Sequence, residues 1–458
     1  MIRKDIIKGE QMKFIRKDVI NLTLPILAEQ LFVISMGMVN TMMAGHIGKE
    51  AVSAIGMVDS INNIVIAFFS ALAVGGMVVV AQFIGQSNIK KANASMKQAL
   101  YSSILISIII TLLMFIFKRF ILSFLFGAAE AEVISSANTY LSITLLTYPL
   151  ITMDLICNGI LRGAGDTKTP MKITIFMNIM NVIFTFTFIN ILKLGIIGAA
   201  LGIALARSIG AFIVLFVLLK GSSVLKLTNL KKFKFDFTLL KPIFSIGVPA
   251  SIESLLFNGG KLITQVFIVD MGTISIASNS ITSSIGSMLN IPGNALCIAA
   301  TALVGQHMGK GETEEASDTL AYITKLSTVS LTAMALLFLP FSGLAPRLYT
   351  SDTNIINLSR NVCILYAIFI PIWSISFVLP AGLKGAGDAK YTMVTALIGM
   401  WLFRITLGYF LGINLNLGLI GVWSGMFVDW AVRGSLYLIR FKKGIWKEKQ
   451  VITRVASR

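Results

Sequence analysis

The 458-residue chain is poor in charge, histidine and cysteine. Only 13% of its residues are charged, whereas about one quarter of the residues of a soluble domain are, so a soluble globular fold is excluded. The two histidines and three cysteines stand at no metal-ligand spacing and predict neither a metal site nor a disulfide framework. A phosphate-binding loop of the form G-x-x-x-x-G-K-S/T is also missing, which argues against ATP-driven work by this chain alone.

Apolar residues are abundant instead, at 55% of the chain. A membrane-spanning helix needs about 20 consecutive, mostly apolar residues, and twelve segments qualify. They cover residues 19–44, 52–83, 98–117, 136–160, 170–192, 195–219, 243–269, 276–305, 318–341, 359–382, 392–412 and 418–440. Because these runs are long and do not alternate as barrel strands do, we predict an all-α integral membrane protein with twelve transmembrane helices.

The formal net charge of +18 follows membrane topology. If the N-terminus is cytoplasmic, 28 of the 39 Lys and Arg residues lie in inside segments, six lie outside and five lie within spans. Since cytoplasmic loops carry an excess of Lys and Arg, this distribution predicts that both termini are cytoplasmic. We therefore expect the lipid bilayer, and not nucleic acid, as the macromolecular partner.

One phrase occurs twice, as Leu161-Arg-Gly-Ala-Gly-Asp166 and as Leu383-Lys-Gly-Ala-Gly-Asp388, 222 positions apart. At nearly the same offset, Pro25-x-x-x-Glu29 recurs as Pro249-x-x-x-Glu253. A single duplication near the middle of an apolar chain indicates the two-lobed plan of secondary transporters. With six spans per half the copies are parallel, so we predict two pseudo-symmetric six-helix lobes around a central cavity.

This plan divides the chain into four parts. We predict an N-lobe at 1–220, a basic cytoplasmic linker at 221–241, a C-lobe at 242–441 and a basic cytoplasmic tail at 442–458. The chain offers no segment for a soluble catalytic domain, so we predict no enzyme activity and no cofactor. An H⁺ or Na⁺ gradient is the expected energy source, and it requires polar or acidic residues within the spans.

Glu29 and Glu253 are the first candidates for that coupling site. Each follows a proline within the first helix of its lobe, where a carboxylate is costly unless it is paired or hydrated. Both are candidates for ion coupling or substrate contact, with Glu253 slightly favoured because Lys261 lies two turns along the same helix. The alternative is a buried ion pair with Lys261, Arg207 or Arg404.

Further polar residues fall within the predicted spans. Asp154 is a candidate acid, with helix–helix hydrogen bonding as the alternative role, and Asp59, on the second span near Asn62 and Asn63, is another candidate. A polar stripe consists of Asn40, Asn178, Asn181 and Thr185. Its neutral oxygens suggest a Na⁺ site near Asn181, since hard cations take oxygen ligands. Asp429 and Arg433 stand at i,i+4 and are expected to form a structural ion pair.

The doubled phrase is expected to form two cytoplasmic turns. Its glycines allow positive φ and its aspartates can cap the helix that follows, with a direct gating contact as the alternative. The residues concerned are Gly163, Gly165, Asp166, Gly385, Gly387 and Asp388.

Taken together, these motifs resemble the multidrug and toxic compound extrusion (MATE) family. The resemblance rests on Pro25-x-x-x-Glu29, on residues 39–48, on Gly85-Gln86, on the doubled phrase and on Asn181, and it covers nearly the whole chain. It implies export of drugs or other organic, mostly cationic, compounds in exchange for H⁺ or Na⁺. The chain departs from one branch of the family, which has aspartate where Asn40 and Thr185 stand.

Two other functions remain open from the sequence. A flippase for lipid-linked saccharides or peptidoglycan precursors would need several cations facing its cavity to bind pyrophosphate. An intramembrane enzyme would need a nucleophile–base or metal constellation, and none is present. We expect a monomeric multidrug antiporter in the inner (cytoplasmic) membrane of a bacterium.

Overall fold

The computed structural model describes residues 2–45, 47–127, 129–222, 224–228, 234–449 and 451–452. Within these ranges, the side chains of residues 2–13, 38, 40–42, 44–45 and 49 are not described. The described elements are all helical. They are α1 (Ile2–Gly45), α2 (Lys49–Gly85), α3 (Ile89–Phe126), α4 (Ala131–Leu146), α5 (Tyr148–Gly163), α6 (Lys168–Phe186), η1 (Thr187–Ile191), α7 (Gly195–Lys220), α8 (Phe237–Asp270), α9 (Thr273–Leu289), α10 (Ile291–Lys310), α11 (Thr313–Phe338), η2 (Leu339–Phe341), η3 (Ala345–Leu348), α12 (Thr353–Gly385), α13 (Ala389–Leu397), η4 (Ile398–Ile405), α14 (Thr406–Tyr409), η5 (Phe410–Asn414), α15 (Gly418–Lys443) and η6 (Ile445–Glu448).

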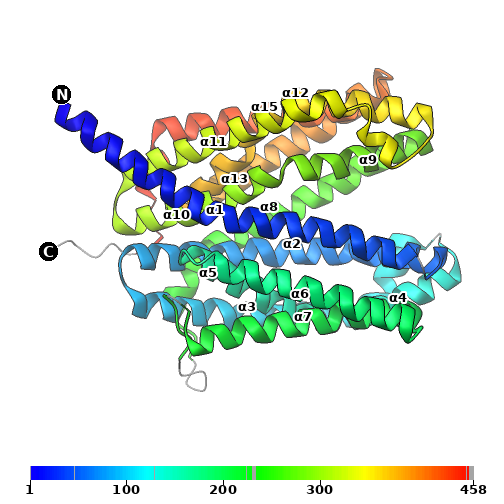
Figure 1. The fold of residues 1–458 in the computed structure, drawn as a ribbon, viewed down its shortest axis with the longest axis horizontal. Coiled ribbons are helices and arrows are strands. Elements are labelled where there is room, and N and C mark those ends of the chain that lie inside the picture. The colour runs from blue at the N-terminus through cyan, green and yellow to red at the C-terminus, as the bar shows by residue number, and fades with distance from the viewer. Residues whose placement is uncertain are drawn as a thin grey trace. The chain divides into compact units, whose positions relative to one another are not determined.

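Each of the twelve predicted spans corresponds to a helix or to adjoining helices (Figure 1). In the described residues, nine helices are long and apolar enough to cross a membrane, and there are eleven such spans when two bent pairs each count as one. The twelfth predicted span is α15, which is 26 residues long and carries Asp429 and Arg433 in its middle. The prediction of an all-α, twelve-span membrane protein is confirmed.

Two spans are bent at a break. The fourth consists of α4 and α5, which meet at 48°, and the eighth consists of α9 and α10, which meet at 51°. Both breaks have a proline in the first turn of the second helix, Pro149 in α5 and Pro292 in α10. Proline lacks an N–H and clashes with the preceding turn, so it is tolerated where a new helix begins.

The described chain forms two compact units. One comprises Met1–Leu27, Gly85–Ser87 and Ile252–Arg458, and the other comprises Ala28–Ile84 and Asn88–Ser251. We refer to them as the C-unit and the N-unit. In the C-unit, α12 packs against α10, α11 and α15, and in the N-unit α6 packs along α7 (Figure 1). Each unit has its own apolar core, so the site residues of each can be described separately.

Candidate functional site

A buried ion pair lies in the N-unit between Glu29 of α1 and Arg162 at the end of α5. The Arg162 Nη2 donates to Glu29 Oε1 at 2.6 Å, and the Thr174 hydroxyl of α6 donates to the same oxygen at 2.9 Å. The Glu29 side chain is 4% exposed. Its second oxygen, Oε2, is buried and has no hydrogen-bond partner among the described residues. One oxygen of this carboxylate is therefore fixed, and the other is an unused acceptor.

Asp154 of α5 lies close to this pair. It is buried, it is attracted electrostatically by Arg162, and it is repelled by Glu29. Its own hydrogen bond comes from Asn158, one turn later, whose Nδ2 donates to Oδ1 at 3.0 Å. The N-unit thus places two carboxylates beside one guanidinium, which leaves the cluster one negative charge in excess when all three groups are ionised. We call Glu29, Asp154 and Arg162 the N-cluster.

The C-unit repeats the ion pair without the second acid. The Lys384 Nζ donates to Glu253 Oε1 at 2.8 Å, and the Thr392 hydroxyl donates to Oε2 at 3.4 Å. Both charged side chains are more accessible than Glu29, at 17% for Glu253 and 19% for Lys384. At the 222-residue offset, Ser376 stands where the N-unit has Asp154. This second pair is electrically balanced.

The partners of both glutamates come from the doubled phrase. Arg162 and Lys384 are its second residues, and the sequence analysis assigned neither of them to these glutamates. A cation at the same place in both copies was the available signal, but a single sequence does not tell which helices its long side chain can reach. The alternative partners predicted for these glutamates were Lys261, Arg207 and Arg404. That prediction is wrong, because none of the three makes an ion pair with either glutamate among the described residues.

Asp59 of α2 belongs to a different network in the N-unit. Asn62 Nδ2 lies 3.4 Å from its Oδ1, and the Tyr148 hydroxyl donates to Asn62 Oδ1 at 2.8 Å. Asp59 is also hydrogen-bonded with Tyr140 and attracted by Arg207. Its charge is therefore opposed by an arginine.

A cavity of about 390 Å³ opens beside Asp59 and is also lined by Thr185. Within the polar stripe, the Thr185 hydroxyl donates to Asn181 Oδ1 at 3.1 Å. Asn178 instead donates to a carbonyl one turn back in α6 and is half-buried. The side chain of Asn40 lies outside the described residues. The structure thus brings together Asp59, Thr185 and Asn181 more closely than it does Asn178.

The doubled phrase forms two similar turns. Gly165 has φ +90° and Gly387 has φ +100°, and both values favour glycine. Asp166 accepts a hydrogen bond from the backbone N–H three residues on, in the first turn of α6. Asp388 makes no such cap, contrary to the expectation, because both of its oxygens accept from Arg440, at 2.7 and 3.2 Å.

Gly163 and Gly385 were expected to take positive φ as well, and this expectation is wrong. Both lie at the ends of regular helices. Their role is close packing: a Cβ at Gly163 would meet the Met77 carbonyl oxygen of α2 at 2.5 Å, and a Cβ at Gly385 would meet that of Thr301 in α10 at the same distance. A side chain at either position would force the two helices apart.

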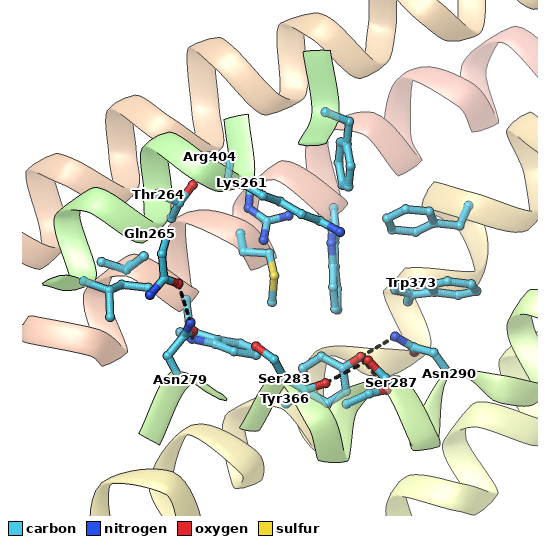
Figure 2. A pocket seen from close by; sticks show the side chains of 18 of the residues that line it. Lys261, Thr264, Gln265, Asn279, Ser283, Ser287, Asn290, Tyr366, Trp373 and Arg404 are labelled. Atoms are coloured by element: carbon cyan, nitrogen blue, oxygen red, sulfur yellow. Dashed lines mark hydrogen bonds between the residues drawn. The ribbon is translucent and has the colours of Figure 1, made fainter. Parts of the chain in front are cut away.

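Lys261 lines a pocket of about 480 Å³ in the C-unit together with Arg404 of η4 (Figure 2). Lys261 lies over the ring of Phe257, with its Nζ 5.0 Å from the ring centroid. The predicted pair of Asp429 and Arg433 is confirmed, with two hydrogen bonds of 2.6 and 2.9 Å. The pocket was not foreseen, because its walls come from five of the spans.

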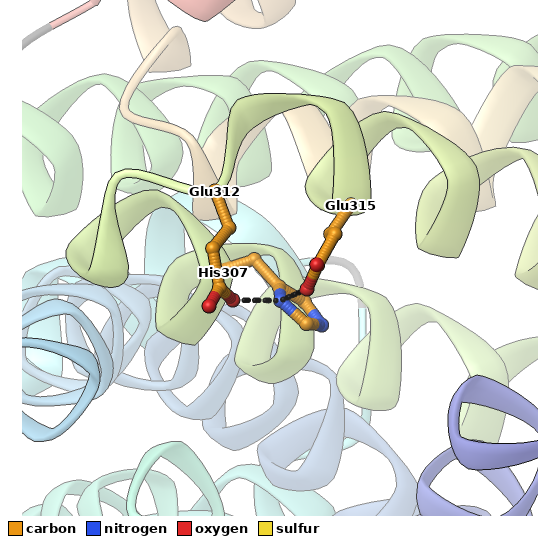
Figure 3. A group of neighbouring side chains, drawn as sticks. All are labelled: His307, Glu312 and Glu315. Atoms are coloured by element: carbon orange, nitrogen blue, oxygen red, sulfur yellow. Dashed lines mark hydrogen bonds and ion pairs between the residues drawn. The ribbon is translucent and has the colours of Figure 1, made fainter. Parts of the chain in front are cut away.

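A second unforeseen group joins the end of α10 to the start of α11 (Figure 3). His307 Nδ1 lies 3.0 Å from Glu312 Oε2 and 3.5 Å from Glu315 Oε2. The potential ligand atoms of these three side chains lie within 4.8 Å of one another. Since the imidazole already bonds Glu312 and Lys310 lies 3.6 Å from the same carboxylate, the group is explained as an ion-paired helix junction.

A protein family model described as MatE matches residues 25–187 and 249–410. A protein of Thermotoga maritima described as a probable multidrug resistance protein, NorM, is 28% identical over 455 residues, covering 98% of this chain and 97% of its own length. The uncharacterized transporter YisQ of Bacillus subtilis is 28% identical over 433 residues, 94% of each chain. The fold matches that of a MOP superfamily transporter from Pyrococcus furiosus with a TM-score of 0.89 at 19% identity, over 95% of this chain and 97% of that one. That transporter is described as having a binding pocket of reverse polarity that suggests a different function.

Proposed function

The chain belongs to the MatE family, and from this premise we propose that it exports small organic compounds, drugs among them, by antiport with H⁺ or Na⁺. Family membership makes it a multi-pass membrane transporter and not an enzyme. The relatives described as multidrug resistance proteins support drugs as its substrates.

The excess negative charge of the N-cluster carries the coupling proposal. Glu29 is bonded to Arg162, and Asp154 is attracted electrostatically by the same guanidinium. With two buried carboxylates and one cation, the cluster is relieved by taking up one positive charge. Either a cation from outside or a cationic substrate from inside satisfies this need. Coupling follows if the ion and the substrate compete for the cluster or favour opposite conformations of the transporter.

A proton suits the N-cluster better than Na⁺ does. A hard metal cation takes several oxygen ligands at once, and Arg162 already holds one oxygen of Glu29. The remaining Oε2 is a single buried acceptor, which one proton can occupy. Protonation of Oε2 neutralises Glu29 and weakens its ion pair with Arg162, so that the guanidinium can pair with Asp154 instead. We propose that this exchange of the partner of Arg162 triggers the conformational change.

Further parts of the proposal concern the setting of the protein. We propose that it is a monomer in the cytoplasmic membrane with both termini in the cytoplasm, on the basis of its Lys and Arg distribution. The substrates are expected to be cationic, because a site with an excess negative charge attracts cations.

The experiment measures efflux of the cationic dye ethidium from proteoliposomes under an imposed ΔpH or ΔNa⁺. The test variant is Asp154→Asn, which keeps the size of the side chain and its bond from Asn158 but removes the excess charge. Its matched control is Glu253→Gln in the balanced pair of the C-unit. We expect ΔpH-driven efflux to be lost in Asp154→Asn and retained in Glu253→Gln. Efflux driven by ΔNa⁺ alone, or normal ΔpH-driven efflux in Asp154→Asn, would contradict the proposal that protons are coupled at the N-cluster.

A further inference from the structure

The pocket of the C-unit differs in charge from the N-cluster. Its lining in the described residues includes two cations, Lys261 and Arg404, and no acid (Figure 2). Lys261 is exposed to the pocket and makes no ion pair with any described residue. The two cations repel each other electrostatically. A pocket built in this way is short of negative charge.

The cations are only partly satisfied by the protein. Arg404 is attracted by Asp429, but both oxygens of that carboxylate accept hydrogen bonds from Arg433. The face of Phe257 lies 5.0 Å from Lys261 Nζ and 5.7 Å from the Arg404 guanidinium carbon, and such contacts favour cations without using their N–H donors. If the two side chains had a purely structural role, N–H groups of Lys261 and Arg404 would lack acceptors.

Two buried donors around the pocket have no acceptor among the described residues. They are Arg404 Nε and the indole Nε1 of Trp430, whose side chain is 3% exposed. A buried donor without a partner is destabilising, so the protein around these cations is short of acceptors. Both atoms are fully buried, and a ligand in the pocket therefore meets the Lys261 ammonium and the Arg404 guanidinium, whose side chains line it. An anion is the chemical group that suits both cations.

The remaining walls fit an aromatic body. Trp373 and Phe377 stack with ring centroids 4.5 Å apart, and Tyr366 meets Trp423 edge-on at 5.7 Å. Polar side chains of α9 and α10, such as Ser287, lie across from the cations in Figure 2. A volume of about 480 Å³ suits a small organic molecule.

We propose that this pocket binds aromatic organic anions, with a carboxylate or sulfonate held by Lys261 and Arg404. The ring system of the ligand lies among the aromatic side chains of the pocket. This assignment goes beyond the proposed function, because it gives the C-unit a ligand of opposite charge to the one expected at the N-cluster. It does not depend on ion coupling.

The experiment measures binding to the full-length protein in phosphatidylcholine nanodiscs, whose lipid has no net charge. Isothermal titration calorimetry compares three probes of the same shape: naphthalene-2-carboxylate, the neutral naphthalene-2-carboxamide, and the cation 2-naphthylmethyl-trimethylammonium. We expect the carboxylate to bind about tenfold or more tightly than the other two, since a charge-assisted hydrogen bond contributes about 1.5–3 kcal/mol. If the carboxamide bound as tightly as the carboxylate, the proposal would be overturned. Titration into empty nanodiscs is the control for partition of the probes into lipid.

Variants locate the binding. Lys261→Gln is the primary test, because its exposed side chain can be replaced without burying an unpaired group, and Arg404→Lys keeps the second charge but removes Nε. Lys325→Gln on α11, which is an exposed cation of the same unit outside the pocket lining, is the matched control. We expect about a tenfold loss of carboxylate affinity in Lys261→Gln and none in Lys325→Gln. Equal affinities in these two variants would contradict the assignment whatever the outcome of the ethidium efflux experiment, because no gradient is applied here.

Discussion

The two halves of the chain build the same carboxylate–cation pair at different degrees of burial. Glu29 is 4% exposed, while Glu253 is 17% exposed. Removing Glu29 loses a buried hydrogen bond between charged groups, which contributes about 1.5–3 kcal/mol, whereas a more accessible pair contributes on the order of 1 kcal/mol. We expect Glu29→Gln to lower the thermal unfolding midpoint of the purified protein more than Glu253→Gln does.

The double variant Glu29→Gln with Arg162→Gln checks the cause. Because the bond between the two side chains is already lost in either single variant, we expect the double variant to lose less stability than the sum of the two single losses. If the double variant loses the sum of the two single losses, Arg162 and Glu29 are not energetically coupled, and the pair is not what makes Glu29→Gln destabilising.

At this scale the sequence predicted where the acids lie but not what they contact. Glu29 and Glu253 were singled out by their depth and by the repeat. Their partners were missed because helical periodicity places a residue on a face, and it does not say which neighbouring helix a long arginine or lysine side chain reaches. The sequence likewise could not predict that the indole N–H of Trp430 lacks a hydrogen-bond partner among the described residues, because this can be recognised only once the surroundings of the side chain are known.

At the scale of helices, repeated sequence does not give repeated geometry. Pro149 begins α5 at a bend, while Pro371 at the matching position lies within the continuous helix α12. The eighth span bends at Pro292, whereas the matching part of α2 contains no proline and belongs to one continuous helix. The length of the apolar runs predicted all twelve spans, but whether a proline breaks a helix depends on the packing around it.

Close helix packing at the doubled phrase gives a test at this scale. Gly385→Ala would place a Cβ 2.5 Å from a backbone oxygen of α10, so we expect a loss of about 1–3 kcal/mol, as overpacking usually causes. Gly259→Ala is the control, because nothing lies within 4 Å of its Cβ position and it is also helical. Thermal unfolding should separate the two variants; a Gly385→Ala protein as stable as Gly259→Ala would contradict the packing argument.

The junction between α10 and α11 predicts a dependence on pH. Burial alone would raise the pKa of Glu312, but the hydrogen bond with His307 and the charge of Lys310 outweigh it and hold the pKa below its usual value. A carboxyl whose pKa is lowered on folding stabilises the fold above its unfolded pKa, and this contribution is lost as the pH falls through the folded value.

We therefore expect Glu312→Gln to lower stability at pH 7, by less than about 1 kcal/mol because the side chain is 38% exposed, and to have no effect near pH 3. Thermal unfolding at the two pH values makes the comparison. A larger effect at pH 3 than at pH 7 would have the wrong sign for this ion pair.

At the scale of the whole molecule, duplication conserved the helices and let the charges diverge. The N-unit combines two acids with one arginine at the N-cluster, while the C-unit keeps a balanced pair and gathers unpaired cations in an aromatic pocket. A single six-helix plan thus carries two sites of opposite electrostatic character. The repeat identifies the equivalent positions in the two halves. Where equivalent residues differ, as Asp154 and Ser376 do, the difference indicates where the functions of the halves diverge.

The orientation of the molecule in the membrane gives the last prediction. Lys193 precedes α7 and Lys226 follows it, and both side chains are exposed. The 26 residues of α7 extend about 39 Å at 1.5 Å per residue, more than the roughly 30 Å hydrocarbon core, so we expect the two lysines on opposite sides of the bilayer. The excess of cations on the side of Lys226 predicts that this side is cytoplasmic. In a protein with Cys157, Cys297 and Cys363 replaced by serine, we expect a membrane-impermeant maleimide added to intact cells to label Lys193→Cys and to label Lys226→Cys only after lysis. Labelling of Lys226→Cys in intact cells would mean that the orientation is the reverse of the predicted one. The turns of the doubled phrase would then also lie outside, because the predicted topology places them on the same side as Lys226.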